Sequence, residues 1–406
     1  MKKLKVVVGL SGGVDSSVAA FLLKQQGYDV IGLFMRNWND ASVTLEDECP
    51  WIDDSRDALS VAEKLGIPFQ VIDLSETYKE RIVDYMFNEY EAGRTPNPDV
   101  LCNREIKFDV FLNAALGLGA DFVATGHYVR KDSIKNKDGN EVFRLLRGLD
   151  SNKDQSYFLC QLNQYQLSKA LFPIGELIKP RVREIAQEID LVTADKKDSQ
   201  GLCFIGKVSL PDFLQQKLST KNGVVMEIAA DEKNSLEYFN RISTEKSIET
   251  AVLRLNPEDC KSTVIGEHKG AHFYTRGQRK GLSIGGKPLP LFVLATDVAN
   301  NIIYVGQGEN HSAMYYRGLR IKADELQWIR PDLNEEFIQH GTEPLFNLKC
   351  QIRYRQTAFS CALMADSVGG SGVVVVFEEL QKNVTPGQFV AVYHGDELIF
   401  SGVISL

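Results

Sequence analysis

The sequence predicts an α/β fold in its first half and β structure in its second half. In the first half, short apolar runs alternate with helical patterns, which is typical of a parallel sheet covered by helices. The second half has short strand-like runs separated by tight turns, which is typical of an antiparallel barrel. We therefore expect an N-terminal parallel sheet with helices on both faces, followed by a small central, mainly β domain and a C-terminal antiparallel β-barrel.

The strand and helix pairs of the first half follow one another closely. Predicted strands cover residues 6–8, 30–34 and 69–74, and the helical stretches that follow them cover residues 16–26, 55–65 and 77–90. One face of the second helix is apolar at helical spacing, through Ala58, Val61, Ala62 and Leu65. A fourth strand, residues 122–125, runs into Gly126. Ligands of such sheets bind at the carboxyl ends of the strands, so we expect a site in the loops that follow them.

The second half is organised by turns. Residues 299–301 separate runs at 291–296 and 302–305, residues 394–396 separate runs at 389–393 and 398–401, and residues 373–377 form a buried strand. We predict three domains, which are residues 1–208, residues 209–286 with an insertion near 229–261, and residues 287–406. Mixed charges in the insertion predict a solvated surface.

Composition limits the possible partners. The net charge of −8 and isoelectric point near 5.5 argue against a generally basic nucleic-acid coat. An RNA partner would have to meet local basic patches, such as the cluster Arg276, Arg279, Lys280 and Lys287. No apolar run approaches the ~20 residues of a membrane helix, so no membrane partner is expected.

The seven cysteines are an odd number without paired spacing, which fits neither a secreted disulfide framework nor a zinc site. We therefore expect a cytoplasmic protein with reduced thiols and no metal-ligand set. Three cysteines have apolar neighbours and are predicted core residues, namely Cys160, Cys350 and Cys361.

A glycine loop, residues 9–17, joins the first predicted strand to the first predicted helix. Its glycines allow close backbone approach, and the helix start offers free N–H groups and a positive dipole to a phosphate. The lysine of a Walker loop is missing. The alternative is an ordinary turn capped by serine, and a lone methionine after the second strand is as often a core residue. The candidate nucleotide-binding residues are Gly9, Leu10, Ser11, Gly12, Gly13, Val14, Asp15, Ser16, Met35 and Gly126.

Two further cysteines are candidates for chemistry. Cys102 lies in a proline-stiffened loop just before a helical pattern from about residue 104 to 116, where the helix dipole would stabilise a thiolate. Asp99, three residues earlier, can act as general acid or base. Cys203 follows two lysines and lies between glycines, which favours a thiolate or persulfide anion. The alternative for both is a packed core cysteine, with Asp99 as a helix cap.

Several motifs together resemble those of the bacterial and mitochondrial tRNA-specific 2-thiouridylases. They run from residue 9 to beyond residue 356 and are S-G-G-V-D-S, G-R-T-P-N-P-D-V-L-C-N, A-T-G-H-Y, K-D-Q-S-Y-F-L, K-K-D-S-Q-G-L-C-F-I-G, G-Q-R-K-G-L-S-I-G-G and I-R-Y-R-Q. The resemblance implies an adenine nucleotide alpha hydrolase-like catalytic domain at residues 1–208 and a tRNA-binding central domain.

The resemblance also implies a reaction. ATP with Mg²⁺ would adenylate the 2-oxygen of the wobble uridine, and Asp99 would handle protons. Cys203 would carry a persulfide received from a sulfur-relay protein or cysteine desulfurase. Cys102 would be its partner nucleophile, leaving a transient Cys102–Cys203 disulfide for a reductant to reopen.

By the same matching, the target base would be held by Asn97, Pro98 and Asp99. The tRNA contacts would be His127, Lys153, Asp154, Gln155, Arg353, Tyr354 and Gln388. Alternatives stay open, because Lys153 and Asp154 can be a solvated surface, Tyr354 a core residue and His127 purely structural.

Two other function classes would use these motifs differently. An adenylating ligase or amidotransferase would use the same glycine loop but be indifferent to Cys203. An RNA-binding module with a cysteine-bound metal cluster would need cysteine spacing that the chain lacks. The role of the insertion at 229–261 and of the acidic loop at 40–57, which contains Cys49, is not assigned by the resemblance.

Overall fold

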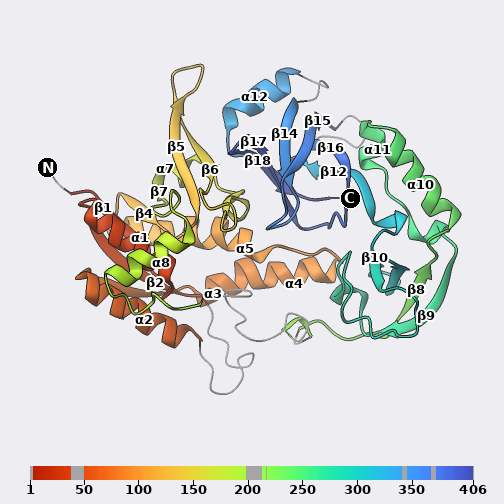
Figure 1. The fold of residues 1–406 in the computed structure, drawn as a ribbon, viewed down its shortest axis with the longest axis horizontal. Coiled ribbons are helices and arrows are strands. Elements are labelled where there is room, and N and C mark those ends of the chain that lie inside the picture. Colours follow the sequence, from red (N-terminus) through yellow and green to blue (C-terminus); the bar gives the residue numbers. More distant parts are fainter. Residues whose placement is uncertain are drawn as a thin grey trace.

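The computed structural model describes residues 3–37, 50–197, 213–215, 217–340, 345–366 and 372–405. These residues form three sheets arranged along the long axis of the molecule (Figure 1). The parallel sheet lies at one end, a four-stranded sheet at the other, and an antiparallel barrel lies between them. The predicted fold class is confirmed. No helix in these ranges has the length and apolar character needed to cross a membrane.

The parallel sheet has the order β3-β2-β1-β4-β7. Its strands are β1 (Lys5–Gly9), β2 (Asp29–Arg36), β3 (Phe69–Asp73), β4 (Phe122–Ala124) and β7 (Ala170–Leu171). Successive side chains of β1 point to opposite faces, so Val7 packs in one hydrophobic core and Val6 and Val8 pack in another. Both faces are therefore covered, as predicted.

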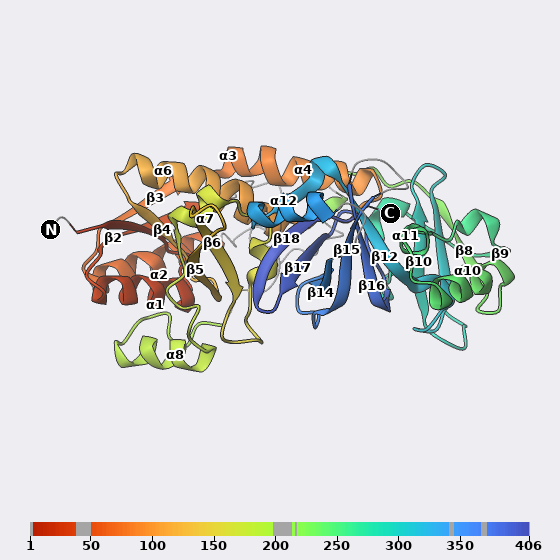
Figure 2. The ribbon, with the colours of Figure 1, turned by 90° about the horizontal axis from the view of Figure 1, so that it is seen from above.

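A different set of helices covers each face of the parallel sheet (Figure 2). One face carries α1 (Val14–Gln25), α2 (Pro50–Leu65) and α8 (Lys179–Glu188). The other face carries two long helical stretches. The first is made of α3 (Ser75–Tyr78), the π-helical η1 (Lys79–Val83) and α4 (Asp84–Glu91). The second is made of α5 (Pro98–Leu101), the π-helical η2 (Cys102–Val110) and α6 (Phe111–Gly117). The predicted apolar face of α2 is buried, at Ala58, Val61, Ala62 and Leu65.

The second stretch corrects one prediction. We expected its helix to begin near Arg104, but it begins at Pro98. Asn97 caps this start by accepting a hydrogen bond from the Val100 backbone N–H at 3.2 Å, and proline is well tolerated in the first turn. Cys102 therefore lies in the second turn and not at the helix start.

The four-stranded sheet has the order β10-β11-β8-β9. Its strands come from both sides of residue 286, the predicted boundary between the central and C-terminal domains. They are β8 (Gly223–Ile228), β9 (Ser262–His268), β10 (Leu291–Asp297) and β11 (Ile302–Gln307). Between β8 and β9 the chain forms α10 (Lys233–Thr244), α11 (Ile248–Val252) and η4 (Pro257–Asp259). Ile248 and Ala251 pack against Val374 and Val376 of the barrel, so part of the insertion is core rather than solvated surface. The three-domain division stays a prediction.

The barrel strands follow the order β12-β16-β15-β14-β17-β18, and a bridge between Arg320 in β12 and Ser405 brings the two ends of this path together. The strands are β12 (Tyr315–Lys322), β13 (Leu326–Trp328), β14 (Leu345–Gln351), β15 (Phe359–Ala365), β16 (Gly372–Lys382), β17 (Phe389–His394) and β18 (Glu397–Val403). The turns predicted at residues 299–301 and 394–396 join antiparallel pairs, as expected. Cys160, Cys350 and Cys361 are buried, which confirms their predicted core position.

One hairpin from the first half joins the barrel. Strands β5 (Val129–Lys135) and β6 (Glu141–Arg147) pair with each other, and Leu146 of β6 lies opposite Glu397 of β18. The shorter remaining elements are η3 (Ser156–Leu159), α7 (Gln164–Lys169), η5 (Ala271–Phe273), η6 (Ser312–Met314), η7 (Ala323–Glu325) and α12 (Pro331–His340). The hairpin thus fastens the N-terminal half to the C-terminal barrel.

Candidate functional site

The glycine loop lies at the carboxyl end of β1 and opens α1. The Ser16 hydroxyl accepts from the Ser11 backbone N–H at 3.1 Å, and the Ser17 hydroxyl donates to the Gly13 carbonyl at 2.8 Å. Gly12 has φ +73°, and a Cβ there would lie 2.2 Å from the Asp54 carbonyl oxygen of α2. Among the described residues no side chain caps the start of α1, so no side chain satisfies its first N–H groups. This is the geometry of an anion cradle.

Asp15 in the first turn of α1 is held by two groups from later in the chain. Lys179 Nζ lies 2.8 and 2.9 Å from its two carboxylate oxygens, and the Tyr128 hydroxyl donates to Oδ1 at 2.7 Å. Lys179 is only 8% exposed, so its charge is poorly hydrated and the ion pair is partly desolvated. Lys179 was not among the predicted site residues. It occupies the first position of α8, and no local sequence pattern connects it to Asp15.

Gly126 and Met35 both lie beside the glycine loop, as the nucleotide prediction requires. A Cβ at Gly126 would lie 2.6 Å from the carbonyl carbon of Asp15 and from the backbone N of Ser16. A Cβ at Gly9 would lie 3.7 Å from Met35 Cε. The loop after β4 therefore packs directly on the start of α1, and only glycine allows this approach.

Cys102 is 3% exposed and lies where α5 passes into η2. Segments of π-helix are rare and occur often at functional sites. The next residue, Asn103, donates from Nδ2 to the carbonyls of Asp99 at 3.0 Å and Phe158 at 3.3 Å. Its Oδ1 is buried and has no partner in the described part of the chain. Cys203, together with its pairing to Cys102, lies outside the described residues.

Asp99 projects from the first turn of the helix that carries Cys102. Burial raises the pKa of Asp99, and the positive charge of Lys107 partly opposes this shift. A carboxyl with a raised pKa keeps its proton to higher pH than an ordinary aspartate. Such a group suits proton transfer at a reacting base.

The loop at residues 93–99 contains the residues predicted to hold the target base and is called the base loop. Hydrogen bonds from the barrel hold it in place. Gln388 donates from Nε2 to the carbonyls of Thr95 at 2.9 Å and Pro96 at 3.0 Å, and its Oε1 accepts from Asn97 Nδ2 at 3.2 Å. The Thr95 backbone N–H also donates to the Pro386 carbonyl at 2.9 Å. Gln388 was predicted as a tRNA contact, and its amide is engaged with this loop.

His127 is buried between the rings of Phe108 and Phe172 and is 7% exposed. Its Nδ1 lies 2.7 Å from the Thr125 hydroxyl. Burial holds the pKa of His127 well below its ordinary value, with a smaller contribution from Lys107, so the ring is neutral at pH 7. In this position the side chain supports the loop after β4, and its contact with tRNA stays a prediction.

The segment 153–155 joins the loop after β4 to the hairpin β5–β6. Gln155 accepts from the Tyr128 backbone N–H at 3.0 Å, and Asp154 accepts from Arg147 at 3.2 Å and from the Ser156 hydroxyl at 2.9 Å. Lys153 is half-buried. These contacts give the segment a structural role alongside the predicted tRNA contact.

Arg353 and Tyr354 lie in the connection after β14. Arg353 is exposed, and the half-buried Tyr354 ring lies 4.2 Å from that of Phe158, centroid to centroid. Phe158 is the residue whose carbonyl accepts from Asn103. The barrel therefore places an aromatic ring close to the helix that carries Cys102.

Known proteins match the chain along its length. The family model described as "tRNA methyl transferase HUP domain" matches residues 4–207, that of the "tRNA methyl transferase PRC-barrel domain" matches 255–307, and that of the "Aminomethyltransferase beta-barrel domain" matches 319–404. A protein of Christiangramia forsetii named "tRNA-specific 2-thiouridylase MnmA" is 60% identical over 402 residues, which cover 99% of this chain and 100% of that protein. Proteins of the same name from Flavobacterium johnsoniae and Karelsulcia muelleri are 58% and 46% identical, covering 99% and 100% of this chain and 100% of each relative.

Proposed function

Because the chain belongs to the tRNA-specific 2-thiouridylase family, we propose that it uses ATP to replace the 2-oxygen of a tRNA uridine with sulfur. The observation that carries this proposal is the 60% identity, over the whole length, to a relative of that name. The products are 2-thiouridine, AMP and pyrophosphate.

In the first step, the uridine 2-oxygen attacks the α-phosphorus of ATP, and the bond to the β-phosphate oxygen breaks. The glycine loop and the open start of α1 hold the released pyrophosphate by their N–H groups. Asp15, in the first turn of α1, would hold Mg²⁺ together with phosphate oxygens, because this ion commonly binds through one or two carboxylates and substrate phosphates. When bound, the ion neutralises phosphate charge. Lys179 keeps Asp15 in place beside the phosphates.

In the second step, sulfur replaces the adenylated oxygen. A persulfide on Cys203 supplies its terminal sulfur to the C2 carbon, and AMP leaves. Cys102 attacks the inner sulfur of Cys203, so the sulfur–sulfur bond breaks and a Cys102–Cys203 disulfide forms. In an alternative order, Cys102 first releases the terminal sulfur as hydrosulfide, which then attacks C2. This order forms the same Cys102–Cys203 disulfide. A two-electron reductant then reopens it, and a sulfur-relay protein or cysteine desulfurase reloads Cys203.

The base loop and its helix provide the setting for this step. Asn97, Pro98 and Asp99 hold the target base, and Asp99 donates or accepts its proton. Asn103 Oδ1 gives a buried acceptor beside Cys102 that a donor on the substrate would satisfy. Arg353 and Tyr354 lie on the barrel side of the helix, where an unstacked base can be approached by an aromatic ring.

Replacing the proposed sulfur carrier tests the function. The Cys203→Ser variant should bind ATP and tRNA but form no 2-thiouridine, measured by mass spectrometry of nucleosides from cells that carry only this variant. Cys260→Ser is the matched control, because burial raises the pKa of the Cys260 thiol to about 12 and leaves it inert. Normal 2-thiouridine in cells with Cys203→Ser would contradict the mechanism and favour an adenylating enzyme that does not use this thiol.

A further inference from the structure

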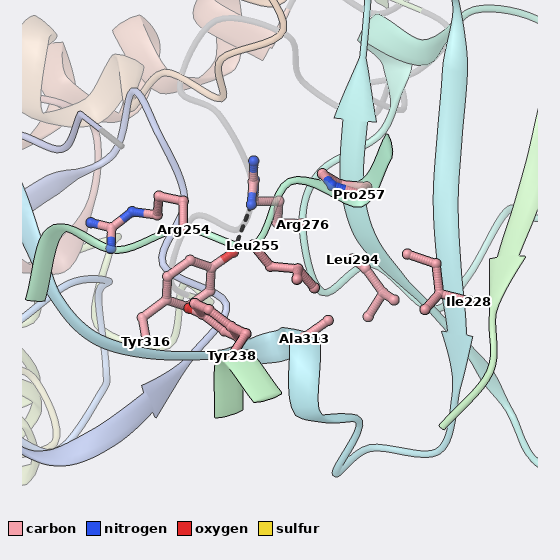
Figure 3. Close-up of a pocket in the computed structure, with 10 residues that line it drawn as sticks. Ile228, Tyr238, Arg254, Leu255, Pro257, Arg276, Leu294, Ala313 and Tyr316 are labelled. Atoms are coloured by element: carbon pink, nitrogen blue, oxygen red, sulfur yellow. Dashed lines mark hydrogen bonds between the residues drawn. The ribbon is translucent and has the colours of Figure 1, made fainter. Parts of the chain in front are cut away.

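A cavity of about 170 Å³ lies between the four-stranded sheet, the α10 and α11 region and the barrel (Figure 3). One end is polar, where Arg276 donates to the Tyr316 hydroxyl at 2.6 Å. The other end is apolar and is formed by Ile228, Leu294 and Pro257. None of the steps proposed above uses this cavity.

Its charge is unbalanced. No aspartate or glutamate is among the described residues that line it, and none of those residues pairs Arg254 or Arg276 with a carboxylate. Arg254 donates only to backbone carbonyls, and its Nε is buried without a partner in the described part of the chain. Burial lowers the pKa of Arg254 to about 10, which leaves it cationic at pH 7. Both guanidinium groups are half-buried and have only neutral partners among the described residues, so an anionic ligand would be stabilised here.

Its size and shape favour one ring. A cavity of roughly 150 Å³ with apolar walls accommodates a benzene molecule, so a cavity of about 170 Å³ accommodates a single six-membered ring. Tyr238 and Tyr316 contribute aromatic walls, and the Tyr238 hydroxyl is fixed by donating to the Tyr315 carbonyl at 2.7 Å. Aromatic walls with a nearby guanidinium are the usual surroundings of an unstacked RNA base.

Its position connects it to the base loop. Thr275, the residue before Arg276, lies with its hydroxyl 3.0 Å from that of Thr95. Thr95 is two residues from Asn97, which is proposed to hold the target base. A strand of RNA that enters the candidate site would therefore pass close to Arg276.

We propose that this cavity is a second nucleotide site for the tRNA substrate, in which an unstacked pyrimidine lies against Tyr238 and Tyr316 and its phosphate lies against Arg276. This inference rests on the proposed function. It also gives a role to the insertion near residues 229–261, because that segment contributes Tyr238, Arg254 and Pro257 to the cavity.

Crosslinking tests the occupant directly. The full chain is mixed with a tRNA transcript that carries 5-bromouridine and is irradiated, and crosslinked peptides are identified by mass spectrometry. We expect a crosslink on Tyr238 or Tyr316. Crosslinks elsewhere on the chain with none on these residues would overturn the proposal. So would loss of this crosslink under excess free uridine 5′-monophosphate without weaker tRNA binding, because the cavity would then belong to a free nucleotide.

Matched variants test the contribution to binding. Arg276→Gln should weaken the dissociation constant for tRNA about tenfold, the size of one lost stacked or charged nucleotide contact. Arg241→Gln removes the same charge from an exposed position of α10 and should stay within about twofold, as expected for one screened surface charge. Ala313→Phe, which fills the cavity, should also weaken binding about tenfold without lowering ATP affinity, and a thermal melt checks its folding.

The outcomes separate the two proposals. If the unaltered chain binds tRNA and forms 2-thiouridine while Arg276→Gln and Arg241→Gln behave alike, the cavity proposal is wrong and the proposed function stands. If the unaltered chain neither binds tRNA nor forms 2-thiouridine, the proposed function fails and the cavity proposal fails with it.

Discussion

The glycine loop and the base loop, which are proposed to serve the same reaction, are held by different parts of the chain. The glycine loop is fixed from within the first half, by Lys179, Tyr128 and the close approach of Gly126. The base loop is fixed from the second half, by Gln388 and Pro386 of the barrel and by Thr275. The difference implies that nucleotide binding depends on one sheet, whereas thiolation also depends on how the barrel docks.

The largest effect is expected for a variant that weakens the support of the glycine loop. Lys179→Met leaves Asp15 without its cation, and losing one partner of a partly buried ion pair costs about 3 kcal/mol, or roughly a hundredfold. We expect ATP affinity and AMP formation in the presence of tRNA to fall together by about this factor. Lys233→Met, at an 82% exposed side chain, is the matched control and should change neither. Unchanged ATP affinity in Lys179→Met would refute the role given to this pair.

The next largest effect is expected for a variant that weakens the support of the base loop and leaves the glycine loop intact. Gln388→Glu replaces a donor that faces the carbonyls of Thr95 and Pro96 by a carboxylate oxygen. Two lost hydrogen bonds of about 1 kcal/mol each predict a roughly tenfold to thirtyfold slower 2-thiouridine formation, with ATP affinity unchanged. Gln381→Glu, a barrel residue that does not contact the base loop, is the control. A parallel loss of ATP affinity in Gln388→Glu would mean that the two loops are not independently held.

A third effect concerns pH and the loop after β4. The pKa of His127 is lowered by burial, so below its ordinary value of about 6.5 the unfolded chain takes up a proton that the folded chain does not. Stability should therefore fall as pH falls through this range, by up to about 1.4 kcal/mol for each pH unit. Denaturant unfolding at pH 7.5 and 5.5 measures this loss. His127→Gln should reduce it, whereas replacement of the exposed His394 should not.

The smallest effect tests the edge of the base loop. Thr275→Val removes the hydroxyl that lies 3.0 Å from the Thr95 hydroxyl. We expect a loss of about 1 kcal/mol in the free energy of unfolding and a less than tenfold change in thiolation, measured on the same preparation. A change larger than that of Gln388→Glu would place the main support of this loop on the central segment instead of on the barrel.

Local patterns were sufficient to predict the sheet, the glycine loop and the barrel turns. Strand and helix periodicity depends on neighbouring residues, and the glycine loop combines strand end, glycines and helix start within residues 9–17. Met35 and Gly126 could be placed near it because parallel strands end at one edge. The start of the helix at Pro98 was missed, although Asn97 followed by Pro98 is a recognisable cap and first-turn signal.

Long-range partners could not be predicted in the same way. Lys179 meets Asp15 across 164 residues, and Gln388 meets the Thr95 carbonyl across 293 residues. Nothing in the surrounding sequence distinguishes either residue from a surface lysine or glutamine, because the partner is set by tertiary packing. The arrangement of Cys102 with Cys203 stays a prediction that rests on resemblance.

The hairpin β5–β6 has a consequence for how the protein is made. Leu146 pairs with Glu397, so the outer edge of β18 becomes available to the hairpin only after about 250 further residues have been synthesised. At about 5–20 residues per second, the hairpin waits roughly 10 to 50 s on the ribosome with an unpaired edge. Charged residues such as Lys131, Asp132 and Arg144 on its two strands would discourage association with other nascent chains during that interval.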